Sequence, residues 1–211
     1  MRASGAGRRI TTVAAAAVLG LGASVTAAVP ATAAPSRAAA GAVAAAEVDY
    51  ATWQSDVKAV IDTATPYVQQ RTTNSSGQKL AIVFDIDNTT LETHYTPWYK
   101  LPTPALKPSL ALAKYAKSRG VAVFFVTARP GIIESVTEWN LESVGYPVDG
   151  LYVRDLPDLF AEVSAYKTAS RADIESDGYT IIANVGNNTT DLVGGHAERT
   201  YKLPDYDGLL D

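Results

Sequence analysis

Residues 80–91 read Leu-Ala-Ile-Val-Phe-Asp-Ile-Asp-Asn-Thr-Thr-Leu. An apolar run ends at Phe84, and two carboxylates, Asp85 and Asp87, follow at once. Short runs without polar alternation are typical of strands covered on both faces, as in a parallel sheet. While the chain stays extended, side chains two residues apart project to the same side. The stretch therefore predicts a buried strand with two acids side by side at its carboxyl end.

The rest of the chain repeats this strand pattern between helical segments. Further apolar runs occupy residues 121–126, 151–153, 180–185 and 200–203, and helical periodicity occupies residues 50–70, 109–119, 132–144 and 159–175. Strands alternating with helices predict an α/β fold with a doubly wound parallel sheet. Ligands of such folds bind at the carboxyl ends of the strands, so candidate functional residues are sought there.

Composition excludes several classes of function. The 211 residues include 18 Lys and Arg, 22 Asp and Glu and no Cys, with a net charge of -4. The first 34 residues hold three Arg and no acid, so the remainder has 15 bases against 22 acids. A broad basic surface for a nucleic acid polymer is therefore not expected. Without cysteine, thiol catalysis, disulfides and Cys-ligated zinc are excluded.

The N-terminal region has the composition of an export signal. A basic start, an Ala/Val/Leu/Gly run and small residues up to Ala34 predict a signal peptide over residues 1–34 and a secreted protein, by a Sec or a Tat route. An uncleaved membrane anchor is the alternative, because the run approaches the ~20 residues that span a bilayer. Residues 35–46 are Ala-rich and predict a leader without a core, and residues 47–211 form the folded domain.

Polar residues stand at the other predicted strand ends as well. Thr127 and Arg129 follow the second run, Lys167 lies on the helix after the third, and Asn187 and Asp191 follow the fourth. Taken singly, each has an ordinary structural explanation, such as a turn, a helix cap or a solvated lysine. Two adjacent carboxylates need a cation or a shared proton, however, and here the complementary groups gather at one edge of the sheet.

In this order the residues resemble the haloacid dehalogenase (HAD) superfamily, and within it the secreted class B type acid phosphatases related to plant acid phosphatases and vegetative storage proteins. Phe-Asp-Ile-Asp-Asn-Thr-Thr-Leu at 84–91 and Phe-Phe-Val-Thr-Ala-Arg at 124–129 carry the resemblance, and Lys167 and the 186–191 loop agree in order and spacing. The similarity extends from about Asp49 to the C-terminal end of the sequence.

The resemblance implies an Mg²⁺-dependent hydrolase of small phosphate monoesters that works through an aspartyl-phosphate. It implies that Asp85 is the nucleophile and that Asp87 is the general acid and base. Thr127, Arg129 and Lys167 are then expected to bind the substrate, with Thr127 and Lys167 also counted as catalytic. For Arg129, a structural partner within the protein is an equal alternative to the substrate. The expected metal ligands are Asp85, Asp87 through its backbone carbonyl, Asn187 and Asp191.

Two features qualify this expectation. Most members of the superfamily have Asp where this chain has Asn187, which predicts weaker metal binding because the site loses a negative charge. The segment 92–108 is long for a connection between a strand and a helix, and predicts a small cap insertion. Its aromatic residues are expected either to stack on a leaving group or to pack the loop down.

Other functions are weighed against this one. A phosphate-binding or storage protein that keeps the fold without turnover is the main alternative, although the nucleophile position is intact. A receiver domain would carry its acceptor Asp on another strand, and a sugar transferase would need nucleotide-sugar contacts that the sequence does not offer. No stable membrane association is expected after signal cleavage, and the natural substrate and oligomeric state are left open.

Overall fold

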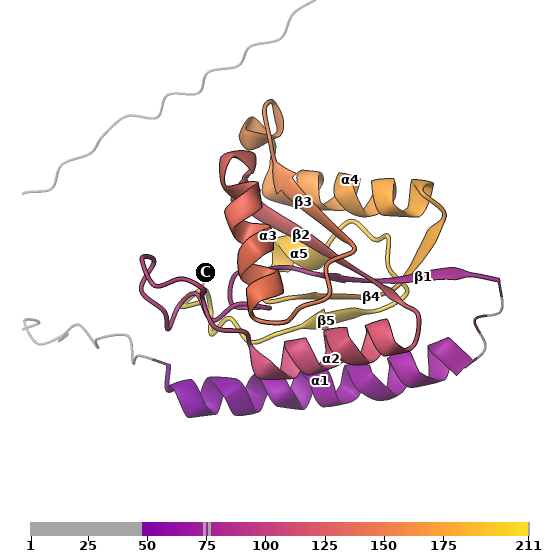
Figure 1. The fold of residues 1–211 in the computed structure, drawn as a ribbon, viewed down its shortest axis with the longest axis horizontal. Coiled ribbons are helices and arrows are strands. Elements are labelled where there is room, and N and C mark those ends of the chain that lie inside the picture. The colour runs from indigo at the N-terminus through magenta and orange to yellow at the C-terminus, as the bar shows by residue number, and fades with distance from the viewer. Residues whose placement is uncertain (1–47, 74, 76, 211) are drawn as a thin grey trace, which may run out of the picture. The chain divides into compact units, whose positions relative to one another are not determined.

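The computed structural model describes residues 48–73, 75 and 77–210 (Figure 1). The predicted signal peptide and leader lie outside these residues. The described elements are α1 (Tyr50–Thr73), β1 (Lys79–Phe84), α2 (Lys107–Ser118), β2 (Ala122–Pro130), α3 (Glu134–Ser143), β3 (Gly150–Arg154), α4 (Val163–Ser176), β4 (Tyr179–Gly186), α5 (Thr189–Leu192) and β5 (Thr200–Lys202). Among these helices, none is long and apolar enough to cross a membrane.

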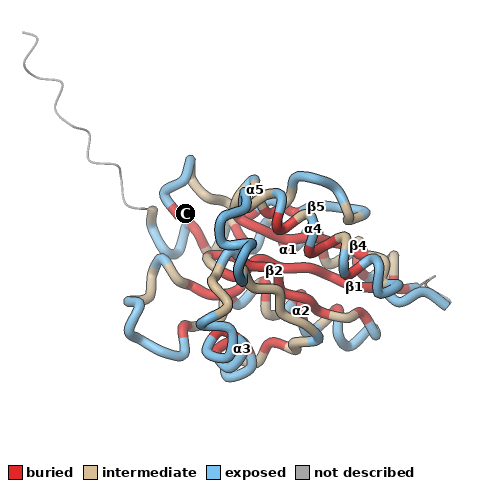
Figure 2. Tube along the Cα trace, turned by 90° about the horizontal axis from the view of Figure 1, so that it is seen from above, coloured by how far each residue is buried: buried red, intermediate tan, exposed pale blue. Residues whose placement is uncertain are grey.

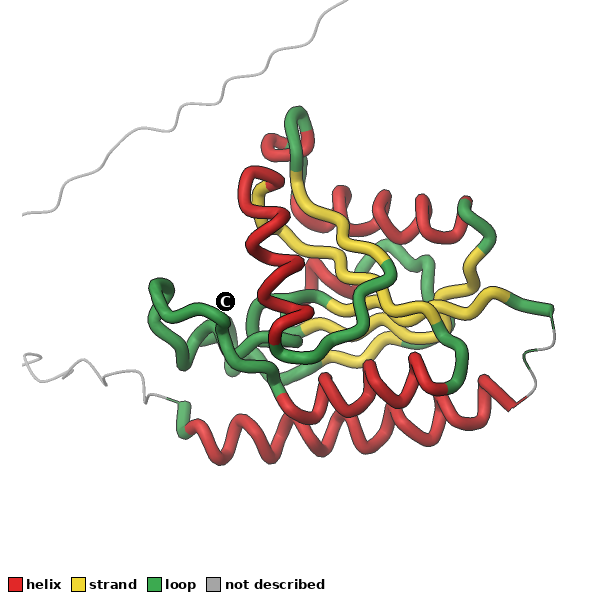
Figure 3. The backbone as a smooth tube through the Cα atoms, in the orientation of Figure 1, coloured by secondary structure: helices red, strands yellow, loops and turns green. Residues whose placement is uncertain are grey.

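The strands form one parallel sheet in the order β3-β2-β1-β4-β5. The chain builds outward from β1 to β2 and β3, and then returns through α4 to pair β4 with the other edge of β1. The strand order thus reverses between β1 and β4, and in open α/β sheets ligands bind beside such a reversal at the carboxyl ends. In Figure 3 the green loop that follows β1 lies at that end of the sheet.

Helices cover both faces of the sheet, which confirms the predicted fold class. In Figure 1, α1 and α2 lie below the sheet and α4 lies above it. Along β1, Leu80, Ile82 and Phe84 join the core shared with α1 and α2, whereas Ala81 and Val83 join the core under α4. Both faces of the strand are therefore buried, as the red central tubes of Figure 2 show. This double burial explains why the strand carries no polar alternation.

Some boundaries differ from the expectation. Helix α1 runs unbroken through Pro66. Helix α4 begins at Val163, because residues 158–160 form a separate 3-10 turn. Strand β2 continues to Pro130, and a 3-10 turn separates it from α3, so Thr127 lies within a strand and does not cap a helix. The short helix α5 was not predicted, because four residues are too few to show helical periodicity.

The predicted cap insertion is a tethered loop. Residues 92–106 form turns and isolated bridges between β1 and α2. The ring of Tyr95 stacks on Trp53 of α1 at 4.9 Å. At the other end of the loop, Asn140 of α3 accepts a hydrogen bond from the Thr103 amide and donates one to its carbonyl, both at 2.9 Å. Tyr95 thus packs the loop down and does not reach a leaving group.

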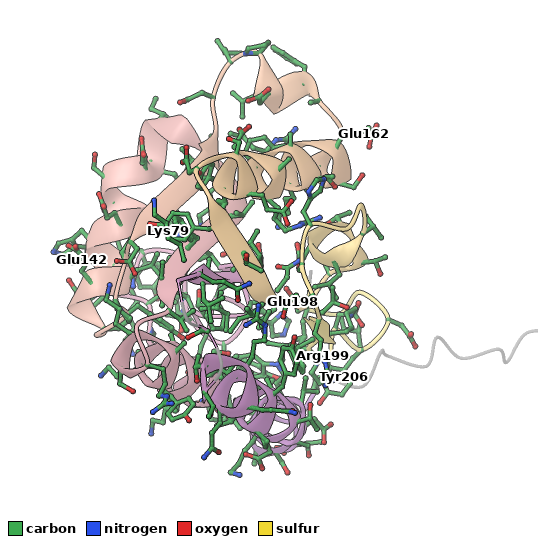
Figure 4. The ribbon with its side chains drawn as sticks, turned by 90° about the vertical axis from the view of Figure 1, so that its right-hand side faces the viewer. Lys79, Glu142, Glu162, Glu198, Arg199 and Tyr206 are labelled. Carbon is green, nitrogen blue, oxygen red and sulfur yellow. The ribbon has the colours of Figure 1, made fainter. Side chains whose placement is uncertain are left out.

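The segment after β4 is fastened to α1. Glu198 accepts hydrogen bonds from Arg71 and Tyr67, and the Tyr206 hydroxyl donates to Asp56 at 2.7 Å. Figure 4 labels Glu198 and Tyr206 on the side of the molecule that carries α1. These contacts fix the course of the chain before it reaches the carboxyl ends of β1 and β4.

Candidate active site

A pocket of about 310 Å³ opens at the carboxyl ends of β1 and β4. Most of the predicted site residues line it, although they come from positions up to about a hundred residues apart in the chain. The lining residues are Asp85, Asp87, Ala128, Val163, Lys167, Asn187, Asn188, Thr190, Asp191 and Leu210. The reversal of strand order between β1 and β4 is therefore where the candidate catalytic groups meet.

Lys167 joins two buried carboxylates in this pocket. Its Nζ lies 2.6 Å from Asp85 Oδ1 and 2.5 Å from Asp191 Oδ1. All three side chains are at most 8% exposed, so water screens these charges little. Position 167 lies in the first turns of α4, which places the ammonium over the end of β1. The alternative of a solvated lysine is therefore wrong.

Burial controls the protonation of this cluster. It raises the pKa of Asp85 to about 7; the Lys167 ammonium opposes this shift, and the charges of Asp191 and Asp87 add to it. Burial alone would lower the pKa of Lys167, but the two neighbouring carboxylates outweigh it and the pKa is raised. One lysine thus stabilises two carboxylates, and Asp85 keeps an affinity for a proton or a further cation.

Asp87 is engaged by Arg129. The guanidinium donates through Nη2 to Oδ1 at 2.7 Å and through Nε to Oδ2 at 3.0 Å, so the two side chains form a bidentate pair. The side chain of Asp87 is 47% exposed and that of Arg129 is 19% exposed, so the pair lies at the mouth of the pocket. In this structure the guanidinium of Arg129 therefore pairs with a carboxylate of the same chain.

Thr127 is the most deeply buried of the predicted substrate-binding residues. It is fully buried and does not line the pocket, whereas its neighbour Ala128 does. Its Oγ1 accepts a hydrogen bond from the Arg129 amide at 3.2 Å. Substrate binding by this hydroxyl stays a prediction.

Asn187 is held by hydrogen bonds on both ends of its amide. Its Oδ1 accepts from the Thr89 hydroxyl at 3.0 Å, and its Nδ2 donates to the Leu210 carbonyl at 3.2 Å. Asn88 Nδ2 donates to the same carbonyl at 2.6 Å. We call this arrangement of Asn88, Asn187 and Leu210 the carbonyl clamp. It ties the loop after β1 and the loop after β4 to the segment that follows β5.

The loop after β4 folds tightly back on its strand. A Cβ atom at Gly186 would lie 2.4 Å from Asp191 Oδ2, so glycine is required for the carboxylate to approach this closely. Asn188 and Asp191 form a capping box at the start of α5, in which Asp191 Oδ2 accepts from the Asn188 amide at 2.8 Å. Both Asp191 oxygens thus have protein donors, one from Asn188 and one from Lys167.

The pocket offers oxygen atoms suited to a hard cation, but few carboxylates. No group of three or more His, Cys, Asp or Glu arranged to hold a metal ion occurs among residues 48–73, 75 and 77–210. The oxygen atoms that remain as possible metal ligands are those of the Asp85 carboxylate, the Asp87 backbone carbonyl and the Asn187 side chain. Mg²⁺ accepts all three kinds of ligand. The raised pKa of Asp85 fits a site in which a cation completes the charge. A direct metal bond from Asp191 stays untested.

Sequence reasoning did not single out three residues that shape this site. Leu210 and Asn88 enter through the carbonyl clamp, which joins positions 122 residues apart and leaves no local pattern. Arg171 contacts the backbone of Asp191 from one helical turn beyond Lys167. Of these three residues, only Arg171 had a signal in the sequence, because Lys167 and Arg171 are two cations at i, i+4 spacing on one helix.

The chain is similar to several known plant proteins. The chain is 35% identical to a stem 28 kDa glycoprotein of Glycine max over 117 residues, which are 53% of this chain and 46% of that protein. It is 30% identical to a stem 31 kDa glycoprotein of the same plant over 173 residues, 72% of this chain and 67% of the relative. Acid phosphatase 1 of Solanum lycopersicum is 27% identical over 172 residues, with the same coverage.

The chain spans about half the length of the first of these relatives. A solved structure with a similar fold is the class C acid phosphatase from Bacillus anthracis, with a TM-score of 0.59 and 19% identity over 75% of this chain and 80% of that one. The family described as HAD superfamily, subfamily IIIB (acid phosphatase), matches residues 6–209. With a match of that length, this chain belongs to the HAD superfamily, subfamily IIIB.

Proposed function

We propose that this protein is an acid phosphatase, a hydrolase of small phosphate monoesters that works through an aspartyl-phosphate on Asp85. The observation that carries the proposal is the buried Lys167, whose ammonium holds Asp85 and Asp191 together on the wall of the pocket. The family supports the reaction class. A lysine beside the reacting carboxylate suits phosphoryl transfer, because negative charge develops there.

The reaction divides into two displacements. In the first, an oxygen of Asp85 forms a bond to phosphorus, the bond from phosphorus to the ester oxygen breaks, and Asp87 gives a proton to the leaving alkoxide. In the second, Asp87 takes a proton from a water molecule that attacks phosphorus, and the bond to Asp85 breaks. Phosphate leaves, and both carboxyl groups regain their starting states.

Arg129 has to release Asp87 for this role, because the guanidinium occupies both carboxylate oxygens. We propose that the phosphate group of the substrate competes for the guanidinium, which binds phosphate in the same bidentate manner. Asp87 then becomes available as the acid when the substrate arrives. Arg129 would bind the substrate by exchanging one anionic partner for another.

Asp85, the backbone carbonyl of Asp87 and the side-chain oxygen of Asn187 would hold Mg²⁺. When bound, the ion supplies positive charge that screens the nucleophile from the phosphate dianion. Asp191 supports the site through Lys167, and the amides near Ala128 and the ammonium of Lys167 bind phosphoryl oxygens.

Release of phosphate from a chromogenic aryl phosphate, with and without Mg²⁺, tests the proposal. Asp85→Asn removes the nucleophile and is expected to abolish turnover, whereas Asp62→Asn on the exposed face of α1 serves as the matched control. Trapping with acid and peptide mapping should find a phosphoryl group on the peptide that contains Asp85. Full metal-dependent turnover by Asp85→Asn would refute the assignment.

A phosphate-binding protein without turnover is the second candidate. Two observations favour it: Arg129 occupies Asp87, and the amide of Asn187 is engaged at both ends. Its signature is saturable binding of inorganic phosphate with no release of phosphate from an aryl ester. The same assay therefore separates the two functions.

We also propose that the protein is exported and that residues 1–34 are removed. The support is the basic start, the apolar run and the small residues before Pro35. Mass spectrometry of the N-terminal peptide of protein recovered from the culture medium tests this proposal. A cell-bound protein that keeps residues 1–34 would contradict it.

A further inference from the structure

Arg171 binds the backbone of the loop that carries Asp191. The side chain is 1% exposed, and it lies on α4 one turn after Lys167. Its Nη1 donates to the Asp191 carbonyl at 2.7 Å, its Nε donates to the Gly195 carbonyl at 3.0 Å, and its Nη2 donates to the Val193 carbonyl. One guanidinium thus fixes three carbonyls within five residues.

This arginine is buried without a direct carboxylate partner. Among the described side chains, none of the ion pairs within 4.0 Å includes Arg171. Burial lowers its pKa, and Asp191 and Glu175 oppose that shift only through longer-range attraction. A buried charge without a close counter-ion is unfavourable in itself, so the three carbonyls have to compensate for the burial of this guanidinium.

The contacts lead from Arg171 to the nucleophile. The carbonyl of Asp191 also accepts from Asn184 Nδ2 at 2.8 Å, so two buried donors fix this residue's backbone. The Asp191 carboxylate then holds Lys167, and Lys167 holds Asp85. If the backbone at residue 191 shifts, the carboxylate moves away from the ammonium, and Lys167 is left with Asp85 alone.

We propose that Arg171 is a positioning residue for phosphoryl transfer, which acts through Asp191 and Lys167 to fix the nucleophile Asp85. This inference rests on the proposed function for its effect on turnover, but its effect on Lys167 does not depend on catalysis. Arg171 does not line the pocket, so it affects the reaction only through the groups that it holds.

The chain offers a matched control in Arg154. Its guanidinium also donates to three backbone carbonyls, those of Asp158, Leu159 and Ala161, in the loop between β3 and α4. That loop has no hydrogen bond with Asp85, Lys167 or Asp191 among the residues that the structure describes. Arg154→Gln therefore removes a similar set of three hydrogen bonds from a loop whose described residues do not contact Asp85, Lys167 or Asp191 through hydrogen bonds.

The experiment compares Arg171→Gln and Arg154→Gln with the wild type in two measurements. The first is aryl phosphate hydrolysis, in which Arg171→Gln should lower kcat by about 10–100-fold, as loss of an outer supporting group commonly does, with KM within about threefold. The second is labelling of Lys167 by an amine-reactive reagent, followed by peptide mapping, in the absence of substrate. Labelling should rise severalfold in Arg171→Gln and stay unchanged in Arg154→Gln.

Unchanged kcat and unchanged labelling in Arg171→Gln would overturn the inference, as would equal effects in both variants. If Arg171→Gln does not fold, as judged by circular dichroism, Arg171→Lys keeps the charge and loses the three-carbonyl geometry, and the same results are expected of it. A wild-type protein that does not hydrolyse the ester refutes the proposed function instead, and the labelling alone then decides the role of Arg171.

Discussion

Replacing Asn187 with Asp should lower the stability of the metal-free protein and raise its affinity for Mg²⁺. The substitution keeps the shape of the side chain and exchanges the Nδ2 donor for an oxygen. That oxygen would face the Leu210 carbonyl, which the amide now approaches at 3.2 Å. The contact between Oδ1 and the Thr89 hydroxyl is retained, because a carboxylate also accepts hydrogen bonds.

The magnitudes follow from these contacts. Loss of a buried hydrogen bond, with an acceptor left facing an acceptor, costs about 1–3 kcal/mol. For a folded part of about 160 residues, each kcal/mol lowers Tm by roughly 2–4 °C, so the metal-free variant should melt about 2–12 °C lower. Two opposite unit charges about 4 Å apart attract by roughly 4 kcal/mol at an effective dielectric constant of ~20. Even after that cost is subtracted, about 1–3 kcal/mol remains, which tightens Mg²⁺ binding by about 5–150-fold.

Thermal unfolding with and without Mg²⁺, together with calorimetric titration of Mg²⁺ into the metal-free protein, measures both effects. Asn188→Asp is the control, since it adds the same charge one residue away while Asp remains a good helix cap for the Thr190 amide. The variant at 187 should be less stable without metal and gain more from it than the control does. An Mg²⁺ affinity that is unchanged or weaker in Asn187→Asp refutes the reasoning.

Three further predictions concern neighbouring groups. The folded-state pKa of Asp85, about 7, exceeds its ordinary value of 3.8, so the folded metal-free protein holds that proton more tightly than the unfolded chain does. Its free energy of unfolding should therefore fall as pH rises from 3.8 to about 7. Urea titrations at a series of pH values should find that this free energy depends less on pH in Asp85→Asn. Arg129→Met removes the exchangeable partner of the substrate phosphate and should raise KM by about tenfold or more, since hydrogen bonds to charged groups contribute about 1.5–3 kcal/mol; an unchanged KM in steady-state kinetics would count against this role. Gly186→Ala places a Cβ 2.4 Å from Asp191 and should cost about 1–3 kcal/mol, so a Tm equal to that of the wild type in calorimetry contradicts the close approach.

Sequence patterns predicted the elements whose burial is uniform. The run from Leu80 to Phe84 is apolar because helices cover both of its faces, and this made the parallel sheet and its polar rim foreseeable. Asp85 and the loop with Asp191 were expected together, since the strand ends of a parallel sheet meet at one edge. Lys167 lies on helix α4, and only the family resemblance predicted it at the same edge.

Other features depend on contacts that have no local pattern. Thr127 was expected at the start of a helix, but β2 extends to Pro130, because part of the strand beyond Val126 still pairs with β3 after a register shift. The bidentate pair of Arg129 and Asp87 depends on how two loops approach each other. Such distances between loops are set by packing and cannot be derived from the order of residues alone.

The carbonyl clamp also has a practical consequence for the design of expression vectors. A purification tag or fusion partner that displaced the peptide group of Leu210 would break its hydrogen bonds with Asn88 and Asn187. Loss of these hydrogen bonds would loosen the loops that carry Asp85 and Asp191. Tags for kinetic work on this protein therefore belong at the other end of the folded part, before α1.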